Sequence, residues 1–446
     1  MNQPIQFLER ANGLLADADV AGQIGALDIR LLGGRPIGIV DNHFVDLLNK
    51  IGGAGTVQVN GQPYDVRREN LLGARYHIGG DGTLSYAPVE SRQFKLELPN
   101  SLSAVHLGVE QAVRIHPDSQ YGYLPFGCTG HIPNISLDSI DNASTVLTLS
   151  HWPANRTPEQ YKANLSTQSS FRYLCEESSK PDAAIVTSDH FDLDGVASIF
   201  AFLAPETALI HKNVLVEVAK LGDFSRGTSR QALSVGFALN ALAENAKSNI
   251  AGNPHSALLQ VYQAVLPMVS KVLGKIDDFS ELYLDNLSHF ERTERLLDHP
   301  DTRLVEHHEV DLAVFHLPSS AESTLLNQYR PYLGLSNISF HNRTKCGVLA
   351  LVRGSQLEIR QRYESWVERV SGIPRARRDL AIFTNALQQG EGKGVVWNYD
   401  GVQHIMPALK NQGIGNSRYS IDTILTELVQ FLKVAPKAWV GTPPGL

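Results

Sequence analysis

The feature that most constrains the fold is the stretch TSDHFDLDGVAS, residues 187–198, which places one histidine and three aspartates between two apolar segments. The segment before it, AAIVTS, is typical of a short buried strand, and DGVASIFAFLA is typical of a helix with one apolar side. Strand, polar loop and helix in this order form the unit of parallel α/β sheets, which place their chemistry at the carboxyl ends of strands. The stretch therefore predicts an α/β protein with a polar site after this strand.

Composition describes a globular protein and narrows its partners. The 446 residues exceed one ordinary hydrophobic core, and 43% apolar with 19% charged residues is typical of a folded, non-membranous chain. The net charge of −7 argues against nucleic acid as the main partner, because nonspecific binding to nucleic acid needs clustered positive charge. A short oligonucleotide is the one exception that stays open.

The cysteines and the N-terminus indicate the compartment. Cys128, Cys175 and Cys346 are odd in number and widely separated, so they predict no disulfide framework and favour a reducing environment. The N-terminus lacks the basic start and apolar core of a secretory signal, and no stretch of 18 residues is apolar and free of charge. We therefore expect a cytoplasmic protein that does not contact membranes.

Changes in residue pattern divide the chain into three expected domains. Residues 1–140 hold short alternating segments such as TVQVNGQPYDV, whose NG pair is a strong hairpin signal, and predict a small α+β or β-rich module. Residues 145–318 predict the main α/β domain, a central parallel sheet flanked by helices, with a helical insertion over 228–298. Residues 319–446 predict a C-terminal α/β domain on the substrate side.

Helices are expected throughout the middle of the chain. The segment TPEQYKANLSTQSSFRYLCEE predicts a helix that Thr157 caps and in which Pro158 takes the first helical position. Apolar residues that recur at spacings of three and four predict four more, over residues 209–220, 229–247, 255–273 and 279–297.

The acidic loop has the donor types of a metal site. In an extended chain His190, Asp192 and Asp194 alternate and project to one side, where two carboxylates would repel each other without a cation. Histidine mixed with carboxylates favours Mn²⁺, with Mg²⁺ or Fe²⁺ as alternatives. The other interpretation is purely structural, with Asp189 and Asp194 capping and solvating a strand-to-helix turn.

The segment AAIVTSDHFDLDGVASIFAFL resembles the first motif of the DHH phosphoesterase superfamily, in which an apolar strand, a loop of the D/H-x-D-x-D-G type and a helix of small residues follow one another. This resemblance implies a DHH-like fold and a dinuclear metal site, usually manganese, in which His190, Asp192, Asp194 and a second-motif aspartate bind the ions. Asp223, in VAKLGDFS, is the candidate for that aspartate, and a plain C-terminal helix turn is its alternative.

The third DHH motif is expected to follow a later strand, where the sequence reads VEHHEVD with glutamate in place of aspartate. The resemblance makes His307 and His308 candidate catalytic residues that contact phosphoryl oxygens or complete the metal shell. A surface pair of histidines at a turn explains the same residues. The fourth-motif aspartate is not identified, and the glycine-rich signature of the superfamily is absent.

Three further residues are candidates for substrate binding. Arg360 and Arg362 share a strand face in QLEIRQRYESWV and suit a phosphate. The alternative is that Arg362 and the residues after it, including Glu364 and Trp366, form a half-buried strand with a structural ion pair. His151, in LTLSHWP, either joins the site or packs within its turn. From LTLSHWP onward the chain also resembles a bacterial domain family of unknown activity that carries SHWP, HFDxDG, GDF and RYExWV stretches.

These observations lead to one main hypothesis and one alternative. The main hypothesis is a metal-dependent hydrolase of a phosphoester or phosphoanhydride, acting on a small phosphorylated molecule or a short nucleotide with water activated by two divalent ions. The alternative is a non-hydrolytic metal-binding, ligand-binding or biosynthetic protein on a degenerate DHH-like fold. P-loop, dinucleotide-binding, nucleophile-elbow and HExxH patterns are absent from the sequence.

Overall fold

In the computed structural model, the part of the chain before residue 107 is described only as the backbone of seven short strands, β1 to β7. The expected NG hairpin is one of these elements, because β3 (Ala54–Val59) and β4 (Gln62–Arg67) pair antiparallel. The remaining described residues are 107–116, 119–152, 155–176, 181–248, 254–318, 331–362, 377–392, 394–402, 404, 406–413, 417–435 and 437–439.

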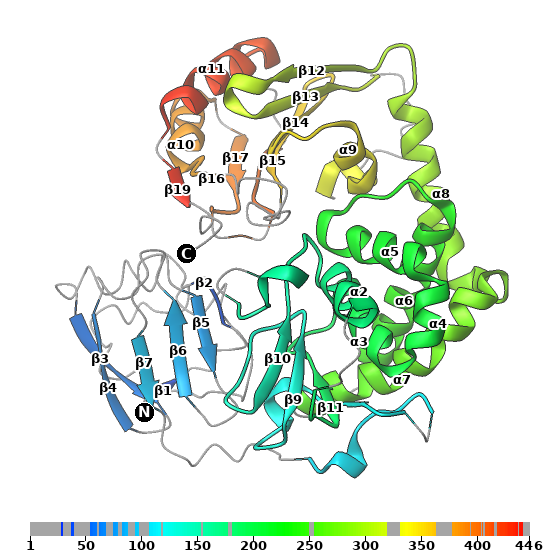
Figure 1. The fold of residues 1–446 in the computed structure, drawn as a ribbon. Helices are drawn as coiled ribbons and strands as arrows, with labels where there is room; N and C mark the ends of the chain where they lie inside the picture. The colour runs from blue at the N-terminus through cyan, green and yellow to red at the C-terminus, as the bar shows by residue number, and fades with distance from the viewer. Residues whose placement is uncertain are drawn as a thin grey trace.

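A four-stranded parallel sheet carries the acidic loop. Its strands lie in the order β10 (Thr145–Leu149), β9 (Asn134–Leu137), β11 (Ile185–Thr187) and β8 (Gly122–Tyr123), and every pairing is parallel. Because the strands are parallel, their carboxyl ends meet at one edge of the sheet. The α/β class with a parallel sheet and flanking helices is therefore as predicted (Figure 1).

The sheet begins earlier in the chain than expected. Strands β8 and β9 lie before residue 140, in the segment predicted to form a separate module, and they pair with β11. All four residues of β9 are buried, as is usual for a parallel strand covered on both faces. Because β8 and β9 are only two and four residues long, the sequence pattern did not show that they belong to this sheet.

Helices cover the sheet and form its core. α3 (Leu193–Leu203) follows the acidic loop and is buried along its whole length. α5 (Lys212–Phe224), α6 (Arg230–Ser248), α7 (Pro254–Gly274) and α8 (Ser280–Leu297) correspond to the four predicted helical stretches. Their apolar side chains join those of α3 and the strands in one cluster, which includes Leu239 and Val265.

The first predicted helix begins later than expected. α2 spans Ser166–Glu176, whereas only a 3₁₀ turn follows Pro158. Thr157 does not cap α2; its hydroxyl accepts from Ser150 N–H at 2.8 Å and donates to Ser150 O at 2.9 Å. Residues near the start of α2 bond instead to Asp194, 28 positions further along the chain, so local sequence could not locate this start.

The segment Ala257–Gly274 of α7 is long and apolar enough to cross a membrane by length and composition alone, and 39% of it is buried inside the protein. Its buried residues, among them Val265 and Val269, pack in the core against α6 and its neighbours. A core helix satisfies the same criteria, so this helix is weak evidence for a membrane segment.

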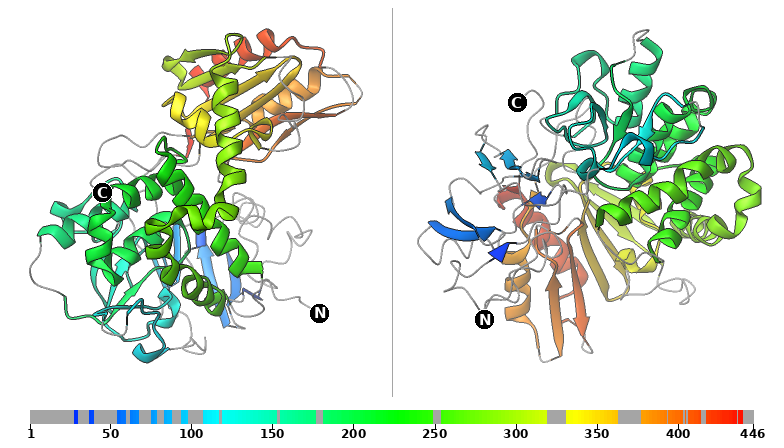
Figure 2. Two further views of the ribbon diagram at one scale, coloured as in Figure 1. Left: turned by 90° about the vertical axis from the view of Figure 1, so that its right-hand side faces the viewer. Right: turned by 90° about the horizontal axis from the view of Figure 1, so that it is seen from below.

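A six-stranded mixed sheet forms the C-terminal domain. The strand order is β12 (Arg303–His307), β13 (Leu312–His316), β14 (Val348–Arg353), β15 (Gln356–Gln361), β18 (Ala408–Gly413) and β17 (Val395–Tyr399). Since β12 and β13 belong to it, this domain starts ahead of the boundary expected at residue 318. Helix α8 links it to the helices of the middle domain (Figure 2, left).

Each face of the mixed sheet has its own core. α10 (Ala381–Gly390) and α11 (Ile421–Val434) pack on one face, and Leu357 and Ile359 of β15 point toward them. α9 (Asn337–Arg343) and the end of α8 cover the other face, where Phe340 contacts Phe315 edge-on. β14 and β15 pair antiparallel and form a hairpin whose turn lies between Arg353 and Gln356.

Gly222 allows α5 to approach α3 closely enough to place the end of α5 beside the acidic loop. A Cβ atom at this position would lie 2.9 Å from the Cβ of Leu193. We expect Gly222→Ala to lower the free energy of unfolding by about 1–3 kcal/mol, the usual cost of overpacking a core. The measurement is denaturant unfolding of the two proteins.

Gly274→Ala is the matched control, because nothing lies within 4 Å of a Cβ built at this last residue of α7. We expect it to be neutral or to stabilise by a few tenths of a kcal/mol up to about 1 kcal/mol. Equal stability of the two variants would contradict the close packing of α5 on α3.

Candidate metal centre

Two aspartates of the acidic loop bind the starts of two helices. Asp192 is the N-cap of α3, and its Oδ1 accepts from the backbone N–H of Gly195 at 2.7 Å. Asp194 lies in the first turn of α3 and accepts from the N–H groups of Ser166 and Thr167 in α2, both at 2.7 Å. The expected extended alternation therefore ends at Asp192, and Asp194 reaches the site from a helix.

Asp138 lies at the centre of the site. It directly follows β9, has a left-handed backbone conformation with φ of 50°, and is fully buried. Its Oδ1 accepts from Ser166 Oγ at 2.7 Å and lies 3.5 Å from His151 Nε2. Its Oδ2 lies 3.6 Å from His190 Nε2, beyond hydrogen-bond distance, in a position that water does not reach.

Asp138 belongs to two groups of possible metal ligands. Asp138, His190 and Asp192 each offer one ligand atom, and these atoms lie within 4.8 Å of one another. The same holds for Asp138, His151 and Asp194. A carboxylate whose two oxygens face two different histidines is suited to bridge a pair of ions, one on each side.

His190 is held so that Nε2 faces this centre. Its Nδ1 lies 2.7 Å from Asp189 Oδ1, and its Nε2 lies 3.0 Å from Asp192 Oδ2. Metal-binding histidines nearly always use their second ring nitrogen to contact a carboxylate or carbonyl in this way. Tyr262 also donates its hydroxyl to His190 O at 2.9 Å and fixes the backbone of the loop.

Asp223 lies beside the second group and contacts it through His151. His151 follows β10, and its Nε2 lies 3.0 Å from Asp223 Oδ2 at the end of α5. The same nitrogen lies 3.9 Å from Asp194 Oδ2. His151 N–H donates to Ser166 Oγ at 3.0 Å, so Ser166 connects the strand end that carries His151 to Asp138.

The neighbouring charged groups of the site shift one another's pKa values. Burial, followed by the nearby Asp192 and Asp194, raises the pKa of Asp138 well above its ordinary value. Although burial acts in the opposite direction, the pKa of His190 is raised well above its ordinary value by Asp192 and Asp189. Although burial acts to raise it, the pKa of Asp192 is lowered to about 2 by His190 and the Gly195 N–H.

A divalent cation fits this environment. Five aspartates and two histidines converge at the carboxyl edge of the sheet, with oxygen and nitrogen donors and no thiolate in either ligand group. A Cβ at Gly195 would lie 3.2 Å from Asp192 Oδ1 and 3.5 Å from Asp138 Oδ2, so glycine leaves room beside both carboxylates. Such donors suit Mn²⁺, Mg²⁺ or Fe²⁺ better than a thiolate-seeking metal. The aspartates are Asp138, Asp189, Asp192, Asp194 and Asp223.

The structure brings together the four residues predicted as metal ligands and adds His151, which was predicted to bind substrate. His307 and His308 lie elsewhere, at the end of β12 in the mixed sheet. Their nearest acidic partners are Glu309 and Glu306, at 3.7 and 3.6 Å. Within the site as described, His307 and His308 therefore do not supply the histidine that the third DHH motif would contribute.

Arg360 and Arg362 are buried in the C-terminal domain. Arg360 donates to Glu358 Oε1 from Nε at 2.8 Å and from Nη2 at 2.7 Å, and this ion pair within β15 was not predicted. The ion pair expected as an alternative for Arg362 involves residues 363–366, which lie outside the described residues. Arg362 Nη1 donates to Thr344 O at 3.0 Å.

Sequence reasoning missed Asp138 and gave Asp189 only a capping role. Asp138 follows PNISL just as Asp189 follows AIVTS, so both come at the carboxyl end of a short strand. That shared position was the available signal. It was overlooked because β9 was assigned to the N-terminal module.

Residues 119–443 match the model of a protein family described as a family of unknown function (DUF6687), and the chain belongs to this family. The matched span contains every residue of the metal centre. No curated protein and no solved structure matches the chain.

Asp138→Asn tests the electrostatics of the centre. The asparagine would keep the acceptor for Ser166 Oγ and remove a carboxyl group that must be either protonated or buried as a charge, so the metal-free protein should gain about 1–3 kcal/mol of unfolding free energy at neutral pH. In the wild type the raised pKa keeps Asp138 protonated to a higher pH than in the unfolded chain. Metal-free stability should therefore fall as pH rises from the ordinary carboxyl range toward the raised pKa.

Denaturant unfolding in EDTA, as a function of pH, provides the measurement, with Asp285→Asn on the exposed face of α8 as the control. If Asp138→Asn lost stability in EDTA relative to that control, the repulsion among the carboxylates would be disproved.

Proposed function

We propose that the protein is a metal-dependent hydrolase of a phosphoester or phosphoanhydride that binds two divalent ions, most suitably Mn²⁺. The observation that carries the proposal is the position of Asp138, whose two oxygens face His151 and His190 in two separate ligand groups. The resemblance of the acidic loop to the DHH phosphoesterases supports the same reaction class. When bound, such ions activate water and stabilise charge on a phosphoryl group.

The chain's own residues orient this site. Asp189 keeps the His190 Nε2 atom directed at the centre, and Ser166 holds Asp138 Oδ1 in place. Because Asp192 and Asp194 are fixed by N–H groups of α3 and α2, their carboxylates are positioned before any ligand binds. Preorganised groups of this kind need no rearrangement as the reaction proceeds.

The C-terminal domain adds positive charge beside the metal centre. His341 of α9 contacts Phe224 O with its Nδ1 at 3.3 Å, one residue after Asp223. Burial, followed by the charge of Arg362, with further contributions from Arg226 and Arg360, lowers the pKa of His341 well below its ordinary value. Arg360 and Arg362 are buried and hydrogen-bonded within the C-terminal domain, so they favour an anionic substrate through their positive charge and not through direct contact.

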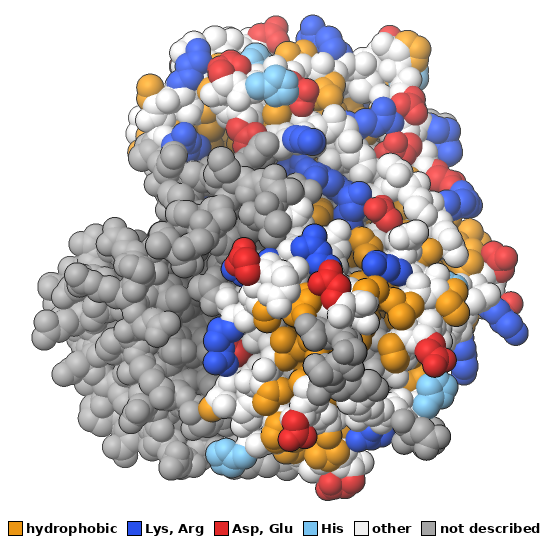
Figure 3. All heavy atoms as spheres, in the orientation of Figure 1, with side chains coloured by type: hydrophobic (Ala, Val, Ile, Leu, Met, Phe, Trp, Pro, Cys, Tyr) orange, Lys and Arg blue, Asp and Glu red, His pale blue; other side chains and the backbone are white. Residues whose placement is uncertain are grey.

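The surface agrees with an anionic substrate. Lysine and arginine side chains gather on one face along the line where the C-terminal domain meets the helices of the middle domain (Figure 3). A small phosphorylated molecule or a short nucleotide has the charge to bind there, whereas the net charge of −7 disfavours a long nucleic acid. The free, largely buried cysteines suit the cytoplasmic location that we propose.

One observation favours the alternative of a non-hydrolytic metal- or ligand-binding protein. The Arg360 guanidinium is largely satisfied by Glu358 and by Met406 O, at 2.9 Å, and it stacks over Tyr332. In that case the ion pair only supports the fold of the C-terminal domain. Catalysis separates the two functions, since a metal-binding protein without hydrolase activity would contain the same centre.

Asp223→Asn tests the hydrolase. With Mn²⁺ added to the EDTA-treated protein, we expect the wild type to hydrolyse bis(4-nitrophenyl) phosphate, 4-nitrophenyl phosphate or pyrophosphate. The substitution should lower kcat/KM at least about 100-fold, the smaller end of what one positioned catalytic group contributes. Initial rates of the two proteins provide the measurement.

Asp285→Asn serves again as the control and should keep wild-type activity. If Mn²⁺ binds to the wild type and none of the three phosphate probes is cleaved, the hydrolase is excluded and the non-hydrolytic alternative remains.

A further inference from the structure

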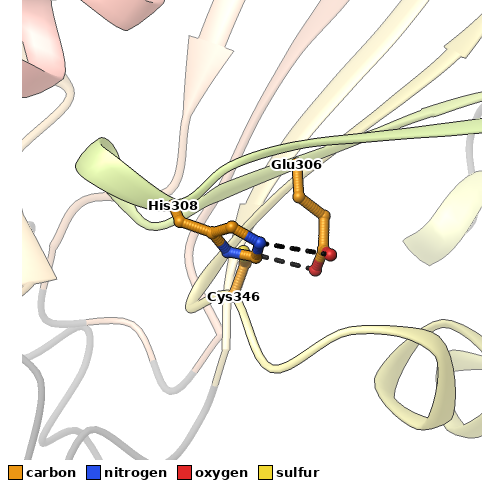
Figure 4. Close-up of side chains that lie close together, drawn as sticks. All are labelled: Glu306, His308 and Cys346. Atoms are coloured by element: carbon orange, nitrogen blue, oxygen red, sulfur yellow. Dashed lines mark hydrogen bonds and ion pairs between the residues drawn. The ribbon is translucent and has the colours of Figure 1, made fainter.

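A second cluster of metal-ligating side chains lies in the C-terminal domain, in a different sheet from the first centre. Glu306 and His308 come from the end of β12, and Cys346 comes from the segment just before β14 (Figure 4). One ligand atom from each residue lies within 4.8 Å of the other two. This group does not depend on the proposed hydrolase.

The register of the sheet explains why these residues meet. His307 pairs with Leu312, and Leu312 pairs with Val348, so β12 ends where β14 begins. Glu306 lies in β12 and His308 begins the 3₁₀ turn that follows, and His308 Nε2 lies 3.6 Å from Glu306 Oε2. Cys346 precedes Val348 by two residues and reaches them past the start of β13.

The distances suit a single ion. Cys346 Sγ lies 3.7 Å from Glu306 Oε1 and 4.0 Å from His308 Nδ1, and His308 Nε2 lies 3.6 Å from Glu306 Oε2. Ligand atoms on one tetrahedral Zn²⁺, with bonds of about 2.0–2.3 Å, are separated by roughly 3.3–3.6 Å. The two contacts of His308 use different ring nitrogens, and the exposed imidazole would bind the ion through one of them.

The surroundings of Cys346 favour a cation. The thiol is buried in the structure, with only 3% of the residue exposed, and its Sγ lies 3.7 Å from Glu306 Oε1. A thiolate and a carboxylate this close together would repel each other unless a cation lay between them. An ion that converts the thiol to a thiolate would also offset the negative charge of Glu306.

Thr344 orients two of the three residues. Its hydroxyl donates to Glu306 Oε1 and accepts from the Cys346 N–H, the latter at 3.0 Å. Metal ligands are commonly fixed by an outer hydrogen bond of this kind. Thr344 O also accepts from Arg362, so the same segment positions a buried arginine.

We propose that Glu306, His308 and Cys346 form a zinc site with three protein ligands and a fourth position open to solvent. The donor set of thiolate, imidazole and carboxylate selects Zn²⁺ or Co²⁺ over Mn²⁺ and Mg²⁺, whose preferred donors are those of the first centre. On binding, the Cys346 thiol loses its proton to water as the sulfur–metal bond forms. The bound ion ties the end of β12 to the start of β14.

Cobalt titration of the full-length protein tests the site, because a thiolate bound to Co²⁺ gives a near-ultraviolet charge-transfer absorption that oxygen and nitrogen ligands do not. We expect the wild type to develop this absorption when it binds one Co²⁺. One equivalent of Zn²⁺ should then abolish the absorption, and one equivalent of Mn²⁺ should not. Cys346→Ser should remove the absorption. His308→Asn should weaken Co²⁺ binding at least about tenfold. Even the loss of a residue that only hydrogen-bonds to a metal ligand lowers metal affinity by this factor or more.

Two control variants match these changes. Cys175→Ser removes an exposed cysteine, and His307→Asn removes the neighbouring histidine, which pairs with Glu309 instead. Both should titrate like the wild type. If Cys346→Ser fails to fold, His308→Asn decides the question, because its side chain is 77% exposed and contributes little to the core.

The proposal is overturned if the wild type shows no thiolate absorption, if the absorption persists in Cys346→Ser, or if His308→Asn binds Co²⁺ like the wild type. If the first centre bound no metal, none of these three results would follow, because that centre contains no thiol. Failure of the proposed hydrolase and failure of the zinc site are therefore distinguishable.

Discussion

The buried carboxylate of Asp138 is the constraint on which the rest of the site depends. It lies between His151 and His190 and within reach of the charges of Asp192, Asp194 and Asp223. A burial of negative charge this dense is unfavourable in a dry interior unless positive charge compensates it. In the metal-free protein His190, whose pKa is raised, supplies part of that charge. In the function that we propose, a pair of divalent ions supplies it instead.

The fold prepares this arrangement before any ion arrives. Three neighbouring parallel strands, β10, β9 and β11, end at one edge and deliver His151, Asp138 and the acidic loop. The helix starts then fix the loop, because Asp192 caps α3 and Asp194 accepts from two N–H groups of α2. The capping interpretation and the metal interpretation of the loop are therefore compatible. Asp192 caps with Oδ1 while its Oδ2 faces His190, and Asp194 Oδ2, although it accepts from Ser166 N–H, also lies 3.9 Å from His151 Nε2.

The sequence predicted the parts of the site that are local. The β11 strand, the acidic loop and α3 are contiguous, so their pattern could be recognised, and Asp223 was found at a helix end. Asp138 could not be recognised in the same way, because strand order decides that β9 lies between β10 and β11. The start of α2 was missed for a related reason, as its cap is a residue far along the chain.

The pair His307 and His308 shows the opposite error, a local motif that predicted a contact which the fold does not make. VEHHEVD has the composition of a third DHH motif, yet β12 pairs with β13 and becomes part of the mixed sheet. His308 is therefore brought to Cys346, a residue 38 positions away, and not to Asp138. Neighbours in the sheet decide which ligands meet, and a short motif does not contain that information.

Electron paramagnetic resonance of the protein loaded with Mn²⁺ tests the central claim most directly, because two Mn²⁺ ions bridged by one carboxylate are magnetically coupled. The account predicts the spectrum of a coupled pair for the wild type at two ions per chain, and its loss in Asp138→Ala. Uncoupled, isolated Mn²⁺ at every loading of the wild type would contradict the claim that Asp138 joins two metal positions.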